Sequence, residues 1–386
     1  MKTRLFAFTL LLLGSSTILV EAISRGTEKI ITDDGYTVEK HQVVTSDGYV
    51  LSLFRIPGYR TTPVFLQHGL LCSSADWVIL GPGRSLAYLL ADAGYDVWLG
   101  NARGNTNSRQ HVTMDPKKAK FWDFSWHEIG LLDLPAMIDY VLEKTGQQSL
   151  HYAGHSQGTT SFFVMASLRP EYNGKIRSMH ALAPVAFMGH LRSPFIRAFA
   201  PFANQIEWTM GMLGVTEFLP SNKMMALGGQ KACEDSSVLQ EACVNALFLV
   251  SGYDSAQTNR TMLPAILENT PAGASVKQFI HFAQGINSGR FRQYDLGIVR
   301  NLMEYGSVSP PSYPLNRISA PVFLHYGDND WLASVTDVGL LHQQLGDSAQ
   351  LLRVPDNRWN HLDFTYGNDA KHLLYDRIIE LMGQHE

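Results

Sequence analysis

The sequence has few cysteines and lacks the short motifs that are typical of metal and nucleotide sites. Three cysteines in 386 residues cannot build a disulfide-dense scaffold. Neither a C-x-x-C nor an H-E-x-x-H pattern is present, which argues against a zinc site. The absence of G-x-G-x-x-G and G-x-x-x-x-G-K-[ST] removes the most common signals for binding dinucleotides and nucleoside triphosphates.

Charge is also scarce. Charged residues make up 17% of the chain, against about 25% in a typical soluble domain. The 31 Lys and Arg residues and the 35 Asp and Glu residues leave a formal net charge of −4. This balance argues against a nucleic-acid partner and against a polybasic membrane-surface protein. Hydrophobic residues account for 45% of the chain, which is enough for a large core and excludes disorder as the main state.

The only long apolar run lies at the N-terminus, where residues 1–22 read as a secretory signal peptide. Two basic residues precede the run Leu5–Leu13, and Val20 and Ala22 suit the −3 and −1 positions of a cleavage site. The alternative is a membrane anchor, but the run breaks at Gly14 and an uninterrupted span needs about 20 apolar residues. We therefore expect cleavage and no transmembrane segment afterwards.

A secretory route changes how the cysteines are interpreted. Cys233 and Cys243 lie close enough in the chain to form a short-loop disulfide in an oxidising compartment, which leaves Cys72 single. Asn259 begins the tripeptide N-R-T, an acceptor pattern for N-glycosylation. Its polar surroundings and the secretory route favour its use.

Short apolar runs alternate with helical patterns along the rest of the chain. This alternation predicts an α/β fold, with a mainly parallel central sheet covered by helices on both faces. The predicted strands are Tyr49–Ile56, Val64–Gln67, Asp96–Leu99, Leu150–Ala153, Met179–Leu182, Val322–Tyr326 and Gln350–Val354. The predicted helices are Ser85–Ala93, Ser125–Lys144, Gln157–Leu168, Val335–Leu345 and Lys371–Met382.

The predicted helix Ser125–Lys144 carries signals at both ends and one in the middle. Ser125 and Glu128 have the spacing of a capping box, and Gly146 suits a C-terminal stop. Pro135 is expected to kink or split the helix, because proline lacks the backbone N–H that a helix interior needs.

Residues 186–310 break the alternation, since they show mostly helical patterns and no convincing strand. We expect a helical cap inserted between two parts of a core, residues 23–185 and 311–386. Apolar residues crowd its first part: Phe195, Ile196, Phe199, Phe202, Ile206, Trp208, Met210, Met212 and Leu213. Most of these are expected to fill the core of the insertion; the alternative is that some line an acyl pocket or a mobile lid.

A single window, Gly154–Gly158, matches G-x-S-x-G with Ser156 at its centre. A predicted strand precedes the window and a predicted helix follows it, which is the context that a nucleophile elbow requires. The flanking glycines permit the tight turn, and the helix N-terminus favours negative charge that develops beside the serine. The alternative, an ordinary turn serine, does not account for this context.

A serine hydroxyl needs a base to become a nucleophile. Asp330 and His361 follow successive predicted strands, so a parallel sheet brings them to the same edge as Ser156. His361 would be the base and Asp330 would hold its other ring nitrogen. The alternatives Asp328 and Asp363 are better interpreted as loop caps or surface charges.

The third requirement of the predicted site is an oxyanion hole, which binds the negative charge that develops on the carbonyl oxygen. His68–Leu71 follows the strand Val64–Gln67. Hydrolases with a nucleophile elbow place one backbone N–H donor at such a strand end, and Leu70 is the predicted donor. The second donor is the residue after the nucleophile, Gln157. The alternative for the first turn is a plain strand end.

Taken together, these stretches resemble the acid lipase family of the α/β-hydrolase superfamily, which includes gastric lipase, lysosomal acid lipase and their insect relatives. The resemblance is carried by Asp47–Leu51, His68–Leu71, Gly100–Asn105, Gly154–Thr160, Asn329–Ala333 and Asn360–Phe364, in the family's order.

The resemblance implies an α/β-hydrolase fold with a helical cap and lid within residues 186–310, a catalytic triad of Ser156, Asp330 and His361, and N–H donors at Leu70 and Gln157. It also implies a Cys233–Cys243 disulfide and an acid pH optimum. Cys72 is outside the family's pattern, so we expect a free and buried thiol there.

The predicted activity is hydrolysis of ester lipids, most simply triacylglycerols, by a secreted serine lipase that acts at a lipid–water interface. Such chemistry needs no metal and no organic cofactor. A cholesteryl-ester or other lipid esterase of the same family is the first alternative. A catalytically silent fold that only binds lipid is the second. A lysosomal location is the alternative to secretion.

Overall fold

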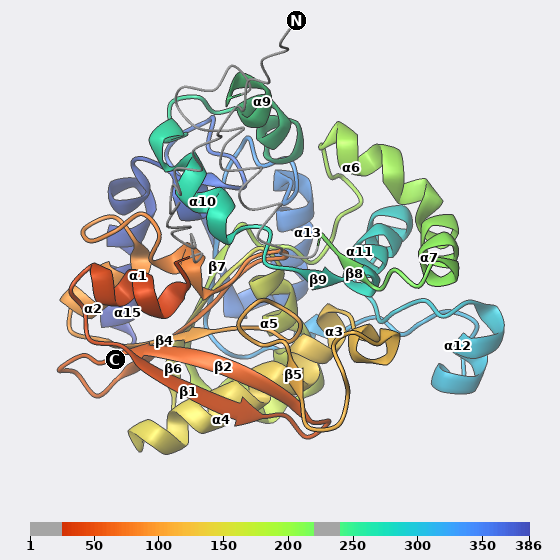
Figure 1. The fold of residues 1–386 in the computed structure, drawn as a ribbon, viewed down its shortest axis with the longest axis horizontal. Helices are drawn as coiled ribbons and strands as arrows, with labels where there is room; N and C mark the ends of the chain where they lie inside the picture. Colours follow the sequence, from red (N-terminus) through yellow and green to blue (C-terminus); the bar gives the residue numbers. More distant parts are fainter. Residues whose placement is uncertain (1–24, 220–239) are drawn as a thin grey trace, which may run out of the picture.

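The computed structural model describes residues 25–219 and 240–386 (Figure 1). The predicted signal peptide, residues 1–22, lies outside the described residues. The centre of the molecule is one sheet whose middle strands are buried along their whole length. Its main strands are β1 (Glu39–Val44), β2 (Tyr49–Ile56), β3 (Pro63–Gln67), β4 (Asp96–Gly100), β6 (Leu150–His155), β7 (Ile176–Leu182), β10 (Val322–Tyr326) and β11 (Ala349–Arg353).

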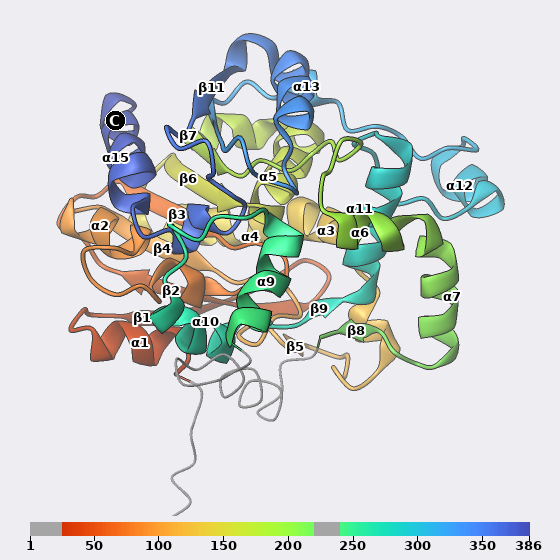
Figure 2. The ribbon, with the colours of Figure 1, turned by 90° about the horizontal axis from the view of Figure 1, so that it is seen from above.

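The order of the sheet is β1-β2-β4-β3-β6-β7-β10-β11, and a short strand β5 (Gln110–His111) pairs with β2. The pairs from β4 to β11 are parallel, whereas β1/β2 and β2/β4 are antiparallel. Helices α2 and α15 lie on one side of the sheet, and α4 and α5 lie on the other (Figure 2). The predicted α/β architecture with a mainly parallel sheet is therefore confirmed.

The core helices are α1 (Thr27–Asp33), α2 (Leu86–Asp92), α3 (Trp126–Glu128), α4 (Leu134–Thr145), α5 (Gln157–Leu168), α13 (Val335–Leu345), α14 (Asp363–Tyr366) and α15 (Asp376–Gln384). A helix forms at each of the five predicted positions of the core, and α1 and α14 are additional helices that were not predicted. The predicted helix 125–144 is split into α3 and α4 by a π-helical turn, Ile129–Asp133, and Pro135 lies in the first turn of the second piece. The capping box at Ser125 and the left-handed stop at Gly146 both form as predicted.

Between β7 and β10 the described chain forms a layer of helices over one end of the sheet. These are α6 (Pro194–Phe199), α7 (Ala203–Met212), α9 (Gln240–Ser251), α10 (Leu263–Asn269), α11 (Val276–Ser288) and α12 (Ile298–Tyr305). The expectation of no strand here was wrong, because β8 (Glu217–Phe218) pairs with β9 (Ala274–Ser275). A pair of two-residue strands is too short to leave an alternating pattern in the sequence.

The expectation that most of the apolar residues between 195 and 213 fill a core was also wrong. Only Ile196, Ile206 and Met210 pack against buried clusters. The other six are more than half exposed: Phe195, Phe199, Phe202, Trp208, Met212 and Leu213. Burial depends on what lies opposite a helix face, and a sequence pattern carries no information on that.

Candidate active site

Ser156 occupies a sharp turn between β6, which ends at His155, and α5, which begins at Gln157. Its backbone has φ of 51° and ψ of −116°, a left-handed conformation that a non-glycine residue rarely adopts. The turn is held by the Ser156 N–H, which donates to the Leu182 carbonyl at 3.0 Å. This strained turn projects the serine hydroxyl from the carboxyl end of the parallel sheet.

The glycines of the motif are needed because β3 passes very close to the turn. A Cβ added at Gly158 would lie 2.4 Å from the carbonyl oxygen of Gln67, a contact that only a backbone shift could relieve. A Cβ at Gly154 would lie 2.8 Å from the carbonyl carbon of Gly158. Glycine at both positions therefore lets α5 start directly against the neighbouring strands.

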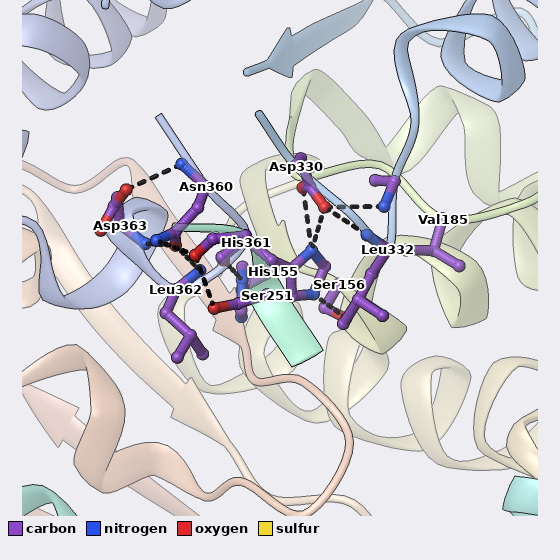
Figure 3. Close-up of polar contacts among 12 residues, drawn as sticks. His155, Ser156, Val185, Ser251, Asp330, Leu332, Asn360, His361, Leu362 and Asp363 are labelled. Atoms are coloured by element: carbon purple, nitrogen blue, oxygen red, sulfur yellow. Dashed lines mark hydrogen bonds and ion pairs between the residues drawn. The ribbon is translucent and has the colours of Figure 1, made fainter. Parts of the chain in front are cut away.

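His361 links Ser156 to Asp330, although these residues are far apart in the chain (Figure 3). The Ser156 Oγ lies 2.8 Å from His361 Nε2, and His361 Nδ1 lies 2.9 and 3.0 Å from the two carboxylate oxygens of Asp330. Because a carboxylate only accepts hydrogen bonds, Nδ1 donates to Asp330 and Nε2 accepts from the serine. A neutral imidazole in this tautomer can take the hydroxyl proton during attack on a carbonyl.

Asp330 is fixed by the turn that follows β10. Its Oδ1 accepts from the backbone N–H groups of Leu332 and Ala333, each at 2.8 Å. The side chains of Asp330 and His361 are 1% and 4% exposed, so their hydrogen bonds are shielded from water. Asp328 instead pairs with Arg353 at the surface, so of the two roles considered for it, it has that of a surface charge.

The backbone of His361 is held from two further elements. Its N–H donates to the Ser251 carbonyl, the last residue of α9, at 3.3 Å, and its carbonyl accepts from His155 Nε2 at 3.0 Å. The Ser251 carbonyl also accepts from the Trp331 N–H at 3.2 Å. One carbonyl of the inserted layer therefore anchors the loops that carry both Asp330 and His361 (Figure 3).

The turn before α14 is closed by Asp363, whose contacts are those of a loop cap, one of the two roles considered for it. Its Oδ2 accepts from the Asn360 N–H at 2.7 Å, and Asn360 Oδ1 accepts from the Leu362 N–H at 2.8 Å. Burial raises the pKa of the Asp363 carboxyl to about 8.

Leu70 lies in the turn that follows β3, beside the serine. A Cβ added at Gly69 would lie 3.3 Å from the Ser156 Cβ, so this turn runs directly against the nucleophile elbow. Gln157 is the first residue of α5, and its backbone N–H has no acceptor within that helix. The two predicted donors therefore flank the serine from neighbouring strands, since β3 and β6 pair at Gln67 and Gly154.

His68 holds the turn that carries Leu70, a role that the sequence analysis missed. Its Nδ1 donates to the Gly69 carbonyl at 2.8 Å, and its Nε2 accepts from the Ala102 N–H at 3.1 Å and the Asn105 amide at 3.0 Å. Burial lowers the pKa of His68 to about 4, so the ring is neutral. Among 14 histidines nothing in the sequence singles this one out, apart from its position after β3.

The inserted layer also touches the predicted oxyanion residue directly. The Gln157 Nε2 donates to Gln278 Oε1, in α11, at 2.7 Å, and both side chains are buried. The sequence analysis did not identify Gln278, because a glutamine on a helix has no distinguishing pattern.

The remaining predicted positions are the cysteines and Asn259. Cys72 is free, as expected, but it is half-buried rather than fully buried. Cys243 is disulfide-bonded, and Cys233 lies outside the described residues. Asn259 is partly exposed and precedes a short helical turn, and its Oδ1 accepts from the hydroxyl of Thr261 at 2.7 Å.

Residues 25–219 and 240–386 contain no cluster of three side chains arranged to hold a metal ion. The helices of the same ranges include none with the length and apolar character to span a bilayer.

A serine on a strained strand-to-helix turn, a histidine and a buried carboxylate after later strands of a parallel sheet define a hydrolase of the α/β type. The comparisons agree with this class. A family model described as "alpha/beta hydrolase fold" matches residues 62–365, and one described as "Partial alpha/beta-hydrolase lipase region" matches residues 27–81.

Curated relatives match over nearly the whole chain. Lipase 3 of Drosophila melanogaster is 50% identical, over 98% of this chain and 98% of its own length. Gastric triacylglycerol lipase of Homo sapiens is 38% identical, over 94% of this chain and 92% of its own length. A soluble variant of monoglyceride lipase from Saccharomyces cerevisiae shares the fold with a TM-score of 0.57 at 14% identity, over 91% and 97%.

The chain therefore belongs to the acid lipase family of α/β-hydrolases, as the resemblance of its motifs predicted. It is a lipase, and so a carboxylic ester hydrolase.

Proposed function

We propose that this lipase hydrolyses triacylglycerols, with Ser156 as nucleophile, His361 as general base and Asp330 as the residue that orients the base. The observation that carries the proposal is the continuous hydrogen-bonded series from the Ser156 hydroxyl through His361 to Asp330, at 2.8 and 2.9 Å. These distances fit proton transfer from the hydroxyl to the ring.

In this mechanism Ser156 Oγ attacks the ester carbonyl while His361 Nε2 takes the hydroxyl proton. The backbone N–H groups of Leu70 and Gln157 bind the oxyanion that forms. The C–O bond to the glycerol breaks as His361 returns the proton to the leaving alkoxide, which leaves an acyl-enzyme. A water molecule, deprotonated by His361, then releases the fatty acid and restores Ser156.

The choice of triacylglycerol is supported by the relatives that carry that substrate in their name. A cholesteryl ester or another lipid ester is the second candidate, because the same triad chemistry would cleave it. A silent fold that only binds lipid is disfavoured, since each member of the hydrogen-bonded series is present and aligned.

The cap is proposed to span residues 186–310 and to carry the lid, between core segments 23–185 and 311–386. Residues of this insertion contact the loops on both sides of Ser156, which supports a role in covering the site. We also propose secretion after cleavage of residues 1–22, glycosylation at Asn259 and a Cys233–Cys243 disulfide; a lysosomal location is the alternative.

The test is hydrolysis of triolein, cholesteryl oleate and a short soluble ester between pH 4 and pH 8, by the wild type and by Ser156→Ala. We expect the wild type to prefer triolein, and the variant to lose several orders of magnitude in kcat on every substrate. A fluorophosphonate probe should label the wild type and not the variant. Near wild-type turnover by Ser156→Ala would overturn the triad, and a preference for cholesteryl oleate would overturn the substrate.

A further inference from the structure

Helix α12, Ile298–Tyr305, turns its apolar side chains outward. Ile298, Val299, Leu302 and Met303 are 70%, 71%, 56% and 82% exposed. Residues four positions apart lie one above the other on a helix, so Ile298 with Leu302 and Val299 with Met303 form two adjacent rows of one apolar ridge. A surface helix of a soluble protein normally buries such a face and exposes its polar one.

Polar groups attach this helix to the molecule instead. Asn301, the one buried residue of α12, donates to Asp295 Oδ1 at 2.7 Å and to the Val308 carbonyl at 3.0 Å, and accepts from the Leu296 N–H at 2.8 Å. The Tyr305 hydroxyl donates to the Tyr294 carbonyl at 2.9 Å. Because these bonds fix the polar side inward, the outward direction of the apolar ridge is built into the fold.

The position of α12 suits contact with an extended surface. In Figures 1 and 2 it projects at the end of the molecule furthest from the C-terminus, and α7 lies at the same end. Helix α7 adds exposed Trp208 and Met212 there, at 68% and 69% exposure. Of the twenty large apolar residues that are exposed in the described chain, fifteen lie between residues 195 and 308.

We propose that α12 is a docking element that inserts its apolar ridge into the surface of an uncharged triacylglycerol phase. The inference deepens the proposed function and rests on it, because the substrate itself forms such a surface. A projecting apolar ridge with polar flanks is the form of an interfacial helix. The charged residues of α12 are Arg300 and Glu304, of opposite sign, so the helix has no net charge that would favour anionic lipid.

The experiment measures binding to triolein droplets in the catalytically inactive Ser156→Ala background, so that the droplets are not consumed. The test variant is Val299→Thr with Met303→Gln, which removes apolar contact and keeps residues that a helix tolerates. The matched control is Val44→Thr with Val112→Thr, at residues that are 53% and 61% exposed and lie outside the inserted layer. We expect the test variant to partition onto droplets about tenfold more weakly and the control to bind unchanged.

A second measurement separates docking from catalysis. In the active background, the test variant should hydrolyse a short soluble ester with wild-type kcat/KM and an unchanged Tm, because α12 does not touch the triad. Hydrolysis of the soluble ester by Ser156→Ala tests the proposed function, whereas droplet binding tests docking. A failure of one proposal can therefore be told from a failure of the other.

Three outcomes would overturn the proposal. One is equal droplet binding by the test variant and its parent. Another is stronger binding to phosphatidylserine or phosphatidylcholine vesicles than to droplets, which would make the partner a membrane. The last is a wild-type dimer in sedimentation that the test variant turns into a monomer, because the ridge would then be an interface between two copies.

Discussion

At the scale of single residues, the site depends on which aspartate faces His361. Asp330 lies 2.9 Å from the ring nitrogen and is nearly fully buried, whereas Asp328 pairs with Arg353 at the surface. The two residues are two positions apart in one turn, so they form a natural pair for substitution.

We expect Asp330→Asn to lower kcat by about four orders of magnitude, because an amide that donates to Nδ1 would leave His361 in the wrong tautomer. Asp328→Asn should stay within about twofold of the wild type, since it removes one exposed ion pair. Steady-state kinetics on a soluble ester measure both. Equal losses in the two variants would mean that the turn, rather than the Asp330 carboxylate, matters.

Sequence reasoning placed Ser156, Asp330 and His361 in one site because strand order and the elbow motif restrict where these groups can meet. It could not find His68 or Gln278. Both act through side-chain bonds to residues far away in the chain, and such pairings depend on how the turns and helices settle in three dimensions.

At the scale of elements, the turn from β6 into α5 depends on close backbone packing. The Cβ of Gly158→Ala would lie 2.4 Å from a backbone carbonyl, whereas a Cβ at Gly339, within α13, has no atom within 4 Å. Both positions are helical glycines with ordinary dihedrals, so helix propensity favours alanine equally at each.

The expected result is a loss of about 3 kcal/mol or more in the free energy of unfolding for Gly158→Ala, through the forced backbone shift. Gly339→Ala should gain up to about 1 kcal/mol. Urea denaturation followed by circular dichroism measures both values. A stable Gly158→Ala protein would show that the elbow has more room than its geometry indicates.

The predicted strands and helices of the core all form, because buried strands and amphipathic helices leave strong apolar patterns. Helices α1 and α14 and the short strand β5 were not predicted. Strand β1 was also missed, since its sequence, EKHQVV, begins with polar residues at the edge of the sheet. The inserted layer was predicted as helical, but its exposed faces were not, as the outward apolar residues of α7 and α12 read like ordinary core positions.

At the scale of the whole molecule, buried histidines make stability depend on pH. Burial lowers the pKa of His68 and His151 to about 4 and of His155 and His325 to about 3. In the unfolded chain each would bind a proton near pH 6.5. Each therefore contributes stability that is present above about pH 6.5 and is lost as the pH falls toward its folded pKa.

Buried carboxyls with a raised pKa act in the opposite direction, as Asp76 and Asp363 show. Burial raises the pKa of Asp76 to about 6 and of Asp363 to about 8, so near pH 5.5 the folded protein holds protons that the unfolded chain releases. Burial also lowers the pKa of His127, His180 and His281 and raises that of Asp133 and Asp254, so in the described chain seven such histidines outnumber four such aspartates. Each uncompensated group changes stability by about 1.4 kcal/mol per pH unit.

We therefore expect the free energy of unfolding to fall by a few kcal/mol between pH 6.5 and pH 5. Urea midpoints at pH 7, 6 and 5 in one buffer series measure this change. The result bears on the acid optimum implied by the family resemblance, because hydrolysis at pH 5 would take place in a less stable protein. A midpoint that rises toward pH 5 would mean that the histidines are compensated by groups not considered above.

The shared carbonyl of Ser251 has a consequence for protein engineering. Since it accepts from the backbone of both His361 and Trp331, the insertion braces the catalytic loops from outside the sheet. Trimming the insertion to widen substrate choice, or exchanging it for that of a relative, would also remove a hydrogen bond that positions His361. A chimera that preserves the α9 terminus should retain its chemistry, whereas one cut through it would need a replacement brace.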